Sequence, residues 1–294
     1  MPPSSVEECC LTCWSCTIGA GAPGEKYEQD GVVERIGSIS EVPKKLALDY
    51  RSELANQQQA WSRKPALRSV YQAWYRRIVD ELSPNGPTVE IGSGVGNFKQ
   101  FHSDTIATDV FPTGSWLDCL VDARQLPFAG ASVGNVVMAD VLHHLPRPLN
   151  VLRDSSRVLK PGGRLVILEP AATRWARLVL GLFHHEPVDL CQDVFGEDGG
   201  PEPANDDFMF ANQAFATLLF VDNPVETQRR VPGLSLRSVS RSDFLVYPAT
   251  GGFSYYSLVP ARAAAPLQRL ENRFVARTGS VSAMRLLVVL ERRS

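Results

Sequence analysis

Residues 88–97 read Thr-Val-Glu-Ile-Gly-Ser-Gly-Val-Gly-Asn, and this stretch decides the fold class. A short β-branched run contains one acid, Glu90, and three glycines follow at alternate positions, Gly92, Gly94 and Gly96. Glycine lets the backbone turn at positive φ and lie against a ligand with no Cβ in the way. The pattern predicts a strand, a tight turn and a helix, which together open a nucleotide-type α/β domain.

The spacing of the glycines separates two interpretations. A dinucleotide-binding turn needs Gly-x-Gly-x-x-Gly, with the helix N-terminus facing a pyrophosphate. Here the third glycine comes one residue early, and Asn97 holds the place where that fingerprint expects it. An NAD(P) site is therefore the weaker interpretation, and it stays open as an alternative.

The segments after the glycine turn predict further strands of the same sheet. Residues 106–109 end a second strand in Asp109, which lies 17 positions after Gly92. A ribose-binding acid is expected about 20 residues after such a turn. The apolar run 133–145 predicts a buried parallel strand ending near Asp140. Residues 157–170 predict a helix end, a Pro-Gly-Gly turn and another buried strand.

In this order and spacing, residues 67–170 resemble the class I S-adenosylmethionine-dependent methyltransferases, whose loop reads Glu/Asp-x-Gly-x-Gly-x-Gly. The resemblance implies an α/β fold with a Rossmann-like seven-stranded sheet, helices on both faces and an antiparallel last strand. It also implies S-adenosyl-L-methionine as the cofactor. The residues that it places at the cofactor are Glu90, Gly92, Ser93, Gly94, Gly96, Asp109, Val110, Asp122, Ala123, Asp140 and Val141.

The same resemblance implies a role for each group. Glu90 stabilises the methionyl ammonium, directly or through the loop, and the glycines line the methionine and the ribose. Asp109 accepts hydrogen bonds from the ribose hydroxyls. Asp122, followed by the small Ala123, faces the adenine amine. Asp140 and Val141 lie where the fourth strand ends, next to the methyl group that is transferred.

Methyl transfer from a sulfonium is an in-line displacement, so the protein mainly aligns the reacting atoms. A general base is needed when the acceptor is a poorly acidic hydroxyl or a protonated amine. His143 and His144 are the candidates beside the fourth strand, because imidazole titrates near neutral pH. His185, beside Glu186, is a third candidate that a lid could bring over the acceptor. Each histidine could equally be a packed or solvated side chain.

Composition limits the class of protein and its partners. The chain has 294 residues, of which 44% are hydrophobic and 21% charged, as in an ordinary globular protein. The net charge of −2 gives no strong basic field, so nucleic acid is an unexpected partner. No apolar run approaches the roughly 18 residues of a membrane span, and residues 1–8 do not resemble a secretory signal. A cytoplasmic enzyme is the expectation, and the sequence does not set its oligomeric state.

Four of the six cysteines lie close together near the N-terminus, as Cys9, Cys10, Cys13 and Cys16. Two Cys-x-x-Cys pairs overlap there, so a zinc or iron–sulfur centre is an alternative. The ligands are too crowded for an ordinary zinc ribbon, and no second pair follows. We therefore expect no metal site and interpret these residues as reduced thiols in a poorly ordered leader.

The predicted organisation has three parts. Residues 1–40 form the leader, residues 41–86 a helical cap, and residues 87–294 the catalytic domain with acceptor-binding insertions at about 171–206 and 244–265. Helices are expected at 44–59, 67–82, 175–183, 207–220 and 267–276, strands at 234–242 and 282–292, and a loop or hairpin at 247–260. The aromatic residues Trp61, Tyr71, Trp74 and Tyr75 either line an acceptor pocket or pack the helix.

The leading hypothesis is a methyltransferase acting on a small molecule with an apolar or aromatic body, at oxygen first, with nitrogen or carbon as the next alternatives. A methyltransferase of RNA or protein is an alternative within the class. The tetrapeptides Asn-Pro-Pro-Tyr and Asp-Pro-Pro-Tyr of base-modifying enzymes are absent after the fourth strand, where residues 140–143 read Asp-Val-Leu-His. The alternatives from other classes are a non-catalytic binding module that keeps the fold and an NAD(P)-dependent oxidoreductase.

Overall fold

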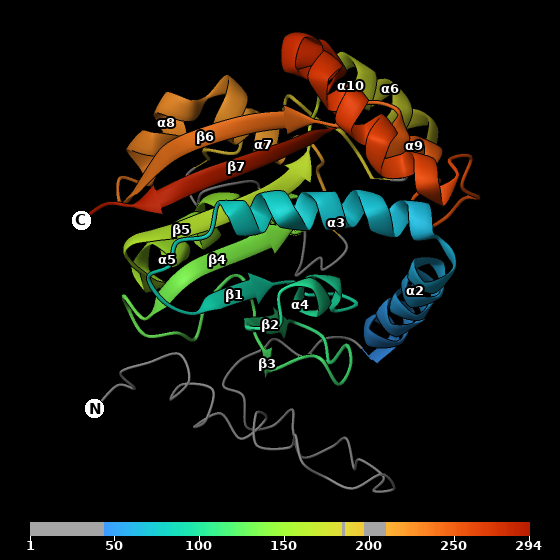
Figure 1. The fold of residues 1–294 in the computed structure, drawn as a ribbon. Helices are drawn as coiled ribbons and strands as arrows, with labels where there is room; N and C mark the ends of the chain where they lie inside the picture. Colours follow the sequence, from blue (N-terminus) through green and yellow to red (C-terminus); the bar gives the residue numbers. More distant parts are fainter. Residues whose placement is uncertain (1–43, 184–185, 197–209) are drawn as a thin grey trace, which may run out of the picture.

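The computed structural model describes residues 44–183, 186–196 and 210–294, and its centre is a seven-stranded sheet (Figure 1). The strand order is β3-β2-β1-β4-β5-β7-β6, and β7 runs antiparallel to both of its neighbours. The predicted Rossmann-like sheet with an antiparallel last strand is confirmed. The strands are β1 Thr88–Ile91, β2 Thr105–Asp109, β3 Cys119–Leu120, β4 Val133–Ala139, β5 Leu159–Pro170, β6 Leu234–Ser242 and β7 Arg285–Arg292.

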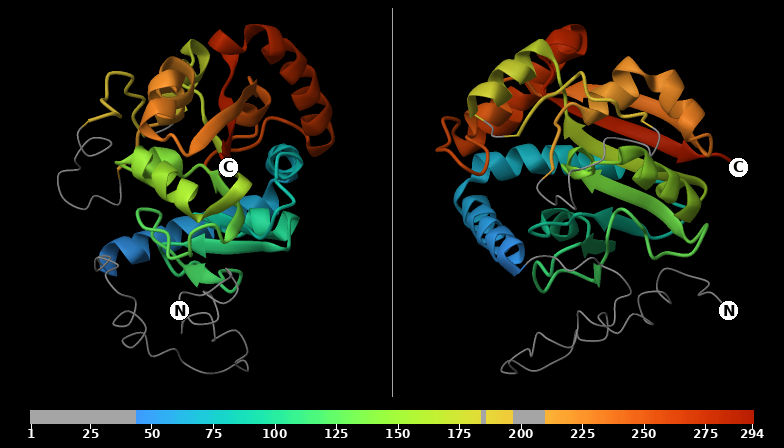
Figure 2. Two further views of the ribbon diagram at one scale, coloured as in Figure 1. Left: turned by 90° about the vertical axis from the view of Figure 1, so that its left-hand side faces the viewer. Right: turned by 180° about the vertical axis from the view of Figure 1, so that it is seen from behind.

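Helices cover both faces of the sheet (Figures 1 and 2). In Figure 1, α3 lies across the near face, and the view from behind in Figure 2 shows α5 and α8 on the other. The helices are α2 Lys44–Arg63, α3 Pro65–Asp80, α4 Asn97–Phe101, the 3₁₀ turn η3 Leu142–His144, α5 Pro148–Val158, α6 Arg174–Phe183, α7 Phe215–Thr217, the π turn η4 Leu218–Asp222, α8 Pro224–Arg230, α9 Val246–Ala249 and α10 Ala261–Ser282. Among these helices, none is long and apolar enough to cross a membrane.

The central strands are buried on both faces, which explains their continuous apolar sequences. In β4, Val136 and Met138 join the core on one side of the sheet, and Val137 joins the core on the other. On that second side α3 contributes a stripe that includes Leu67 and Ile78, both fully buried. Each such side chain stabilises the fold by about 1.5–3 kcal/mol through burial. These contacts hold α3 over the end of the sheet where the site lies.

The largest departure from the predicted elements concerns residues 207–220, where one continuous helix was expected. In the described part, residues 210–214 are not helical, and α7 and η4 follow as short turns. The buried Asn212 explains the irregular start. Its Oδ1 accepts hydrogen bonds from the backbone N–H groups of Asp189 and Ala214, and its Nδ2 donates to the Asp189 carbonyl. These bonds tie the chain to the preceding segment and hold residue 214 out of a helix.

Other boundaries also differ from the sequence patterns. The helix expected at 267–276 runs over the whole of α10, with Pro266 inside it, and the segment expected to be a loop contains α9. The final strand begins at Arg285, three residues later than predicted. The leader with its four cysteines, His185 and most of the acidic loop at 196–207 lie outside the described residues. The proposed domain boundaries stay predictions.

Candidate active site

The site lies at the carboxyl ends of β1, β2, β4 and β5. The chain passes from β1 to β2 on one side and returns to β4 on the other, so a topological switch falls beside β1. Crevices in open α/β sheets form at such points, outside the carboxyl ends of the strands. The glycine turn, Asp109 and Asp140 all come directly after these strand ends.

The glycine turn requires glycine for steric reasons at two positions. Gly92 has φ of 70°, and a Cβ there would lie 2.6 Å from Cγ2 of Val141. Gly96, with φ of 73°, precedes α4, and a Cβ there would overlap the indole ring of Trp116. The Trp116 Nε1 donates to the Gly94 carbonyl at 3.2 Å. The turn is thus packed between the β4 end and an indole that the sequence analysis did not identify.

Glu90 is a buried carboxyl group at the end of β1, with a residue exposure of 4%. Its Oε2 has no hydrogen-bond partner among the described residues. Burial, with a further contribution from the nearby Asp109 charge, raises the pKa of Glu90 to about 8. The Ser93 Oγ lies in the glycine turn, three residues after Glu90, and it too is buried without a hydrogen-bond partner among the described residues. Buried polar groups normally have partners, so these two atoms are free to form hydrogen bonds with a ligand at the glycine turn.

Asp109 is buried and already accepts several hydrogen bonds. Its Oδ2 accepts from the backbone N–H of Gly94 at 2.9 Å and from the Tyr50 hydroxyl at 3.5 Å, and its Oδ1 accepts from the N–H of Phe111. Burial raises the pKa of Asp109, although these donors oppose the shift. Of the three donors only Tyr50, on α2, is a side chain from another element. Its 3.5 Å bond is the longest of the three.

Asp122 and Ala123 follow β3 at the same edge of the sheet. The partly exposed Val110 follows β2, and the buried Ala123 comes three residues after β3. The Asp122 carboxylate forms an ion pair with Arg124 at 2.7 Å and accepts its backbone N–H as well. A contact between Asp122 and adenine would therefore have to share this carboxylate with Arg124. The sequence analysis did not predict this ion pair.

Asp140 ends β4 in a left-handed conformation, with φ of 59°, which is uncommon for a residue with a side chain. Its Oδ1 lies 2.6 Å from Nη1 of Arg285, a buried residue at the start of β7. The guanidinium lies over the ring of Trp74 at 4.5 Å. Burial alone would lower the pKa of Arg285, but the Asp140 carboxylate raises it. The Nε and Nη2 atoms of Arg285 are buried without a partner in the described residues.

His143 is held in a buried ion pair. Its Nδ1 lies 2.5 Å from Oε2 of Glu169, and Oε1 of Glu169 accepts from the N–H groups of Val141 and Leu142. Burial by itself would lower the pKa of His143, but the Glu169 carboxylate outweighs it and raises the pKa to about 10. The imidazolium is therefore unsuited to accept a proton at neutral pH. It instead orients the turn after β4.

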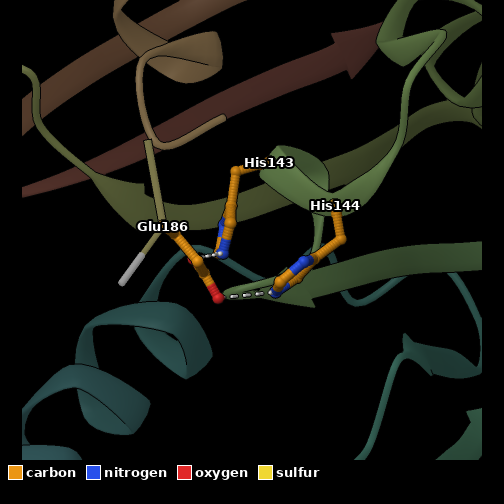
Figure 3. Close-up of side chains that lie close together, drawn as sticks. All are labelled: His143, His144 and Glu186. Atoms are coloured by element: carbon orange, nitrogen blue, oxygen red, sulfur yellow. Dashed lines mark ion pairs between the residues drawn. The ribbon is translucent and has the colours of Figure 1, made fainter. Parts of the chain in front are cut away.

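His144 has the opposite character. Its Nδ1 lies 3.2 Å from the Phe210 carbonyl, so Nδ1 carries the proton and donates it, which leaves the lone pair on Nε2. Burial and the positive charge of His143 lower the pKa of His144, which keeps it neutral at pH 7. Glu186 lies 3.9 Å from this Nε2 and 3.4 Å from Nε2 of His143 (Figure 3). His144 therefore keeps an unprotonated Nε2 at neutral pH, unlike His143.

The ligand-type atoms of His143, His144 and Glu186 lie within 4.8 Å of one another, which is close enough to hold a metal ion. A histidine must lose its proton to bind a metal. Because the pKa of His143 is about 10, a proton already occupies this cluster at neutral pH. The same groups form an ion-pair network, because His143 faces Glu169 with Nδ1 and Glu186 with Nε2.

Aromatic side chains surround Arg285 on the side away from the glycine turn. Tyr71 lies 4.5 Å from Trp74 and 5.6 Å from Phe253, and Trp74 lies 4.9 Å from Tyr247, all between ring centroids. Trp74 also donates from Nε1 to the buried Asp243 at 2.9 Å. A cavity of about 710 Å³ begins at Phe253 and extends between α2 and residues 253–261.

Sequence reasoning found the glycine turn and the acids but missed four side chains of the site: Tyr50, Trp116, Glu169 and Arg285. None lies in a recognisable motif. Glu169 had a signal, because a lone acid ends the apolar run of β5. Arg285 also had one, since it is the only charged residue between Ala283 and Leu290. Tyr50 lies in the predicted polar helix at 44–59, and Trp116 lies in a segment for which no element was predicted, so neither position indicated a contact with the site.

This geometry defines a Rossmann-like nucleotide-binding domain, and the comparisons identify its kind. Residues 89–167 match the family model described as "Methyltransferase domain". Residues 89–167 therefore resemble a methyltransferase domain, and the sheet around them has a Rossmann-like strand order with an antiparallel last strand. A SAM-dependent methyltransferase from Thermotoga maritima shares the fold, with a TM-score of 0.50, 14% identity, and coverage of 83% of this chain and 99% of that one.

Two curated relatives match parts of the chain. The 27-O-demethylrifamycin SV methyltransferase of Amycolatopsis mediterranei is 46% identical over 46 residues, which are 16% of this chain and 17% of the relative. The ubiquinone/menaquinone biosynthesis C-methyltransferase UbiE of Rubrivivax gelatinosus is 30% identical over 122 residues, 36% of this chain and 49% of the relative. The matches span less than half the length of either relative.

Proposed function

We propose that the protein transfers a methyl group from S-adenosyl-L-methionine to an oxygen atom of a small-molecule acceptor. The observation that carries the proposal is the pairing of an incomplete cofactor site with a neutral imidazole. Glu90 and Ser93 keep buried atoms without partners at the glycine turn, and His144 keeps a lone pair on Nε2 across the end of β4.

The residues at the glycine turn and at the ends of β2 and β3 fit the cofactor. Glu90 would hold its ammonium, the turn at Gly92 and Gly94 would lie against its methionyl and ribosyl parts, and Asp109 would accept from the ribose. The Asp122 and Ala123 segment would face the adenine. The cofactor supplies an electrophilic methyl group on a sulfonium. The protein then has to align the acceptor and exclude water.

The residues around the end of β4 suit an acceptor that has an oxygen atom and an apolar body. His144 would remove the hydroxyl proton at Nε2, and its Nδ1–H bond to Phe210 keeps the correct tautomer. The unpartnered Nε and Nη2 atoms of Arg285 would donate to an oxygen of the acceptor. The rings of Tyr71, Trp74 and Tyr247 would contact the apolar part. Both O- and C-methyltransferases occur among the relatives, and His144 favours oxygen because a base is needed there.

Ligand binding separates the proposal from the other classes. Calorimetric titration should show binding of S-adenosylhomocysteine and no binding of NAD or NADP. Binding of NAD instead would indicate an oxidoreductase, and binding of none would indicate a non-catalytic module. Acceptor panels of hydroxylated aromatic compounds, RNA and protein, assayed with methyl-labelled cofactor, then separate a small molecule from a macromolecule.

The base is tested with His144→Gln. Its loss should lower kcat by about 10²–10⁴-fold. In the wild type, kcat should rise with pH through a pKa below 6.5 and then level, since burial and His143 lower the pKa of His144. The variant should lose this rise. His102→Gln, outside the cluster, is the matched control. An unchanged kcat and pH profile in His144→Gln would remove the base from the proposal.

A further inference from the structure

Two helices beyond the end of β5 carry a cluster of exposed arginines. Although the whole chain has a net charge of −2, α6 and α10 present six arginines and few acids. All six are exposed: Arg174, Arg177, Arg262, Arg269, Arg273 and Arg277. The local charge of this surface is therefore opposite in sign to that of the molecule.

Almost no carboxylate balances this charge. Residues 171–183 contain no acid, and residues 244–284 contain Glu271 alone. The Glu271 Oε2 is occupied by the backbone N–H groups of Leu245 and Val246. Within the described ranges, none of the six arginines forms an ion pair. Their charge is available to a partner.

Large apolar side chains are exposed beside the arginines. On α10, Leu267 is 43%, Leu270 61% and Phe274 48% exposed. At 100° per residue these three fall within an arc of about 60°, and the four arginines of the helix occupy the adjoining arc of about 80°. On α6, Leu182 is 67% and Phe183 59% exposed. Each helix thus carries apolar and basic residues together on its outer side.

The two helices form one surface. They pack against each other along the edge of the molecule near the carboxyl end of β5 (Figure 1). Ring contacts continue from α6 to α10, from Trp175 to Phe244 at 4.8 Å and from Phe244 to Phe274 at 5.4 Å. Phe183 at the end of α6 lies 6.1 Å from Tyr255, and in the same loop Leu258 is 84% exposed. We name this surface, from α6, α10 and residues 255–258, the α6–α10 face.

We propose that the α6–α10 face binds the surface of a bilayer that contains anionic phospholipid. Apolar side chains enter the boundary between headgroups and acyl chains, while neighbouring arginines meet the lipid phosphates. A nucleic acid would pair with the arginines but leave Leu182, Leu270 and Phe274 in water. The exposed apolar residues therefore favour the bilayer. This inference is independent of the methyl acceptor.

The test is co-sedimentation of the full-length protein with vesicles of phosphatidylcholine, with and without phosphatidylglycerol. Binding should require phosphatidylglycerol and weaken as salt rises. Removing one arginine should weaken partition about fivefold, so Arg269→Gln/Arg273→Gln/Arg277→Gln should weaken it about 100-fold. Arg153→Gln/Arg229→Gln, on α5 and α8 at the other end of the sheet, should bind as the wild type does.

A second variant separates the bilayer from other polyanions. Leu182→Ser/Leu270→Ser keeps every arginine and should still lose most vesicle binding. Circular dichroism and thermal unfolding verify that each variant is folded, as expected for exposed positions. Wild-type protein that ignores phosphatidylglycerol vesicles would overturn the proposal. A second result would also overturn it. In this result Leu182→Ser/Leu270→Ser binds vesicles as well as the wild type does, and both proteins bind a single-stranded oligonucleotide tightly.

Discussion

Replacing Glu90 by Gln should make the free protein more stable above neutral pH. The pKa of this carboxyl is about 8 in the folded protein against 4.5 as its ordinary value. The unfolded chain therefore releases the proton first, so the folded state loses stability between pH 4.5 and pH 8. At about 1.4 kcal/mol for each pH unit, the loss reaches about 3 kcal/mol at pH 7 and about 5 kcal/mol above pH 8.

Urea unfolding of the wild type and Glu90→Gln at pH 5, 7 and 9 measures this difference. The two proteins should differ little at pH 5, and the variant should gain with each unit up to pH 8. Glu53→Gln changes an exposed glutamate on α2 and serves as the control. Parallel pH profiles of wild type and Glu90→Gln would refute the reasoning, because they would mean that Glu90 ionises as readily in the folded as in the unfolded chain.

The same carboxyl couples cofactor binding to proton release. At pH 7 a group with a pKa of about 8 is about nine-tenths protonated, and a bound ammonium would ionise it. Calorimetry with S-adenosylhomocysteine in two buffers of different ionisation enthalpy should show release of close to one proton by the wild type. Glu90→Gln should bind more weakly and release less. Equal proton release by both proteins would show that the ammonium meets another group.

Three further changes test other parts of the structure. Gly92→Ala places a Cβ against Val141 at positive φ and should lower both the melting temperature and the cofactor affinity. Gly181→Ala, which has open space around it in α6, should instead be neutral or stabilising by up to about 1 kcal/mol. Trp74→Phe removes the hydrogen-bond donor to Asp243 and should lower the free energy of unfolding in urea by about 1–3 kcal/mol. Trp61→Phe should lower it less, and an equal loss in both variants would contradict the role of that bond. Glu169→Gln removes the charge that holds the pKa of His143 near 10, so an NMR titration should find His143 losing its proton several pH units lower, and an unmoved pKa would place its counter-charge elsewhere.

The central half of the fold could be predicted from sequence because local and long-range requirements coincide there. Strands β1, β2, β4 and β5 are short apolar runs that end at an acid or a turn, and their order follows from right-handed crossover connections. The glycines at 92, 94 and 96 announce a backbone conformation that other residues resist. These signals are local in the sequence, so they can be recognised without knowledge of the tertiary contacts.

The remaining residues of the site could not be predicted because their roles arise from contacts between distant segments. Arg285 reaches Asp140 across 145 positions of sequence only because β7 inserts between β5 and β6. Tyr50 reaches Asp109 because α2 lies over the glycine turn. His143 and His144 are adjacent in sequence and looked equivalent. Their surroundings, Glu169 for one and the Phe210 carbonyl for the other, shift their pKa values in opposite directions.

The distribution of charge divides the site into two halves with different preferences. The ionisable groups include Glu90, Asp109, Asp140, His143, His144, Glu169, Glu186 and Arg285. On the acceptor side, Arg285 pairs with Asp140 and His143 pairs with Glu169, and Glu186 adds a third carboxylate close to both histidines. At the glycine turn, the Asp109 charge adds to burial in raising the pKa of Glu90, and Lys99 opposes this rise only in part. A ligand with positive charge opposes the rise further, so this half favours a sulfonium that also carries an ammonium. Because methyl transfer removes the sulfonium charge, the same half should hold the product less tightly than the reactant.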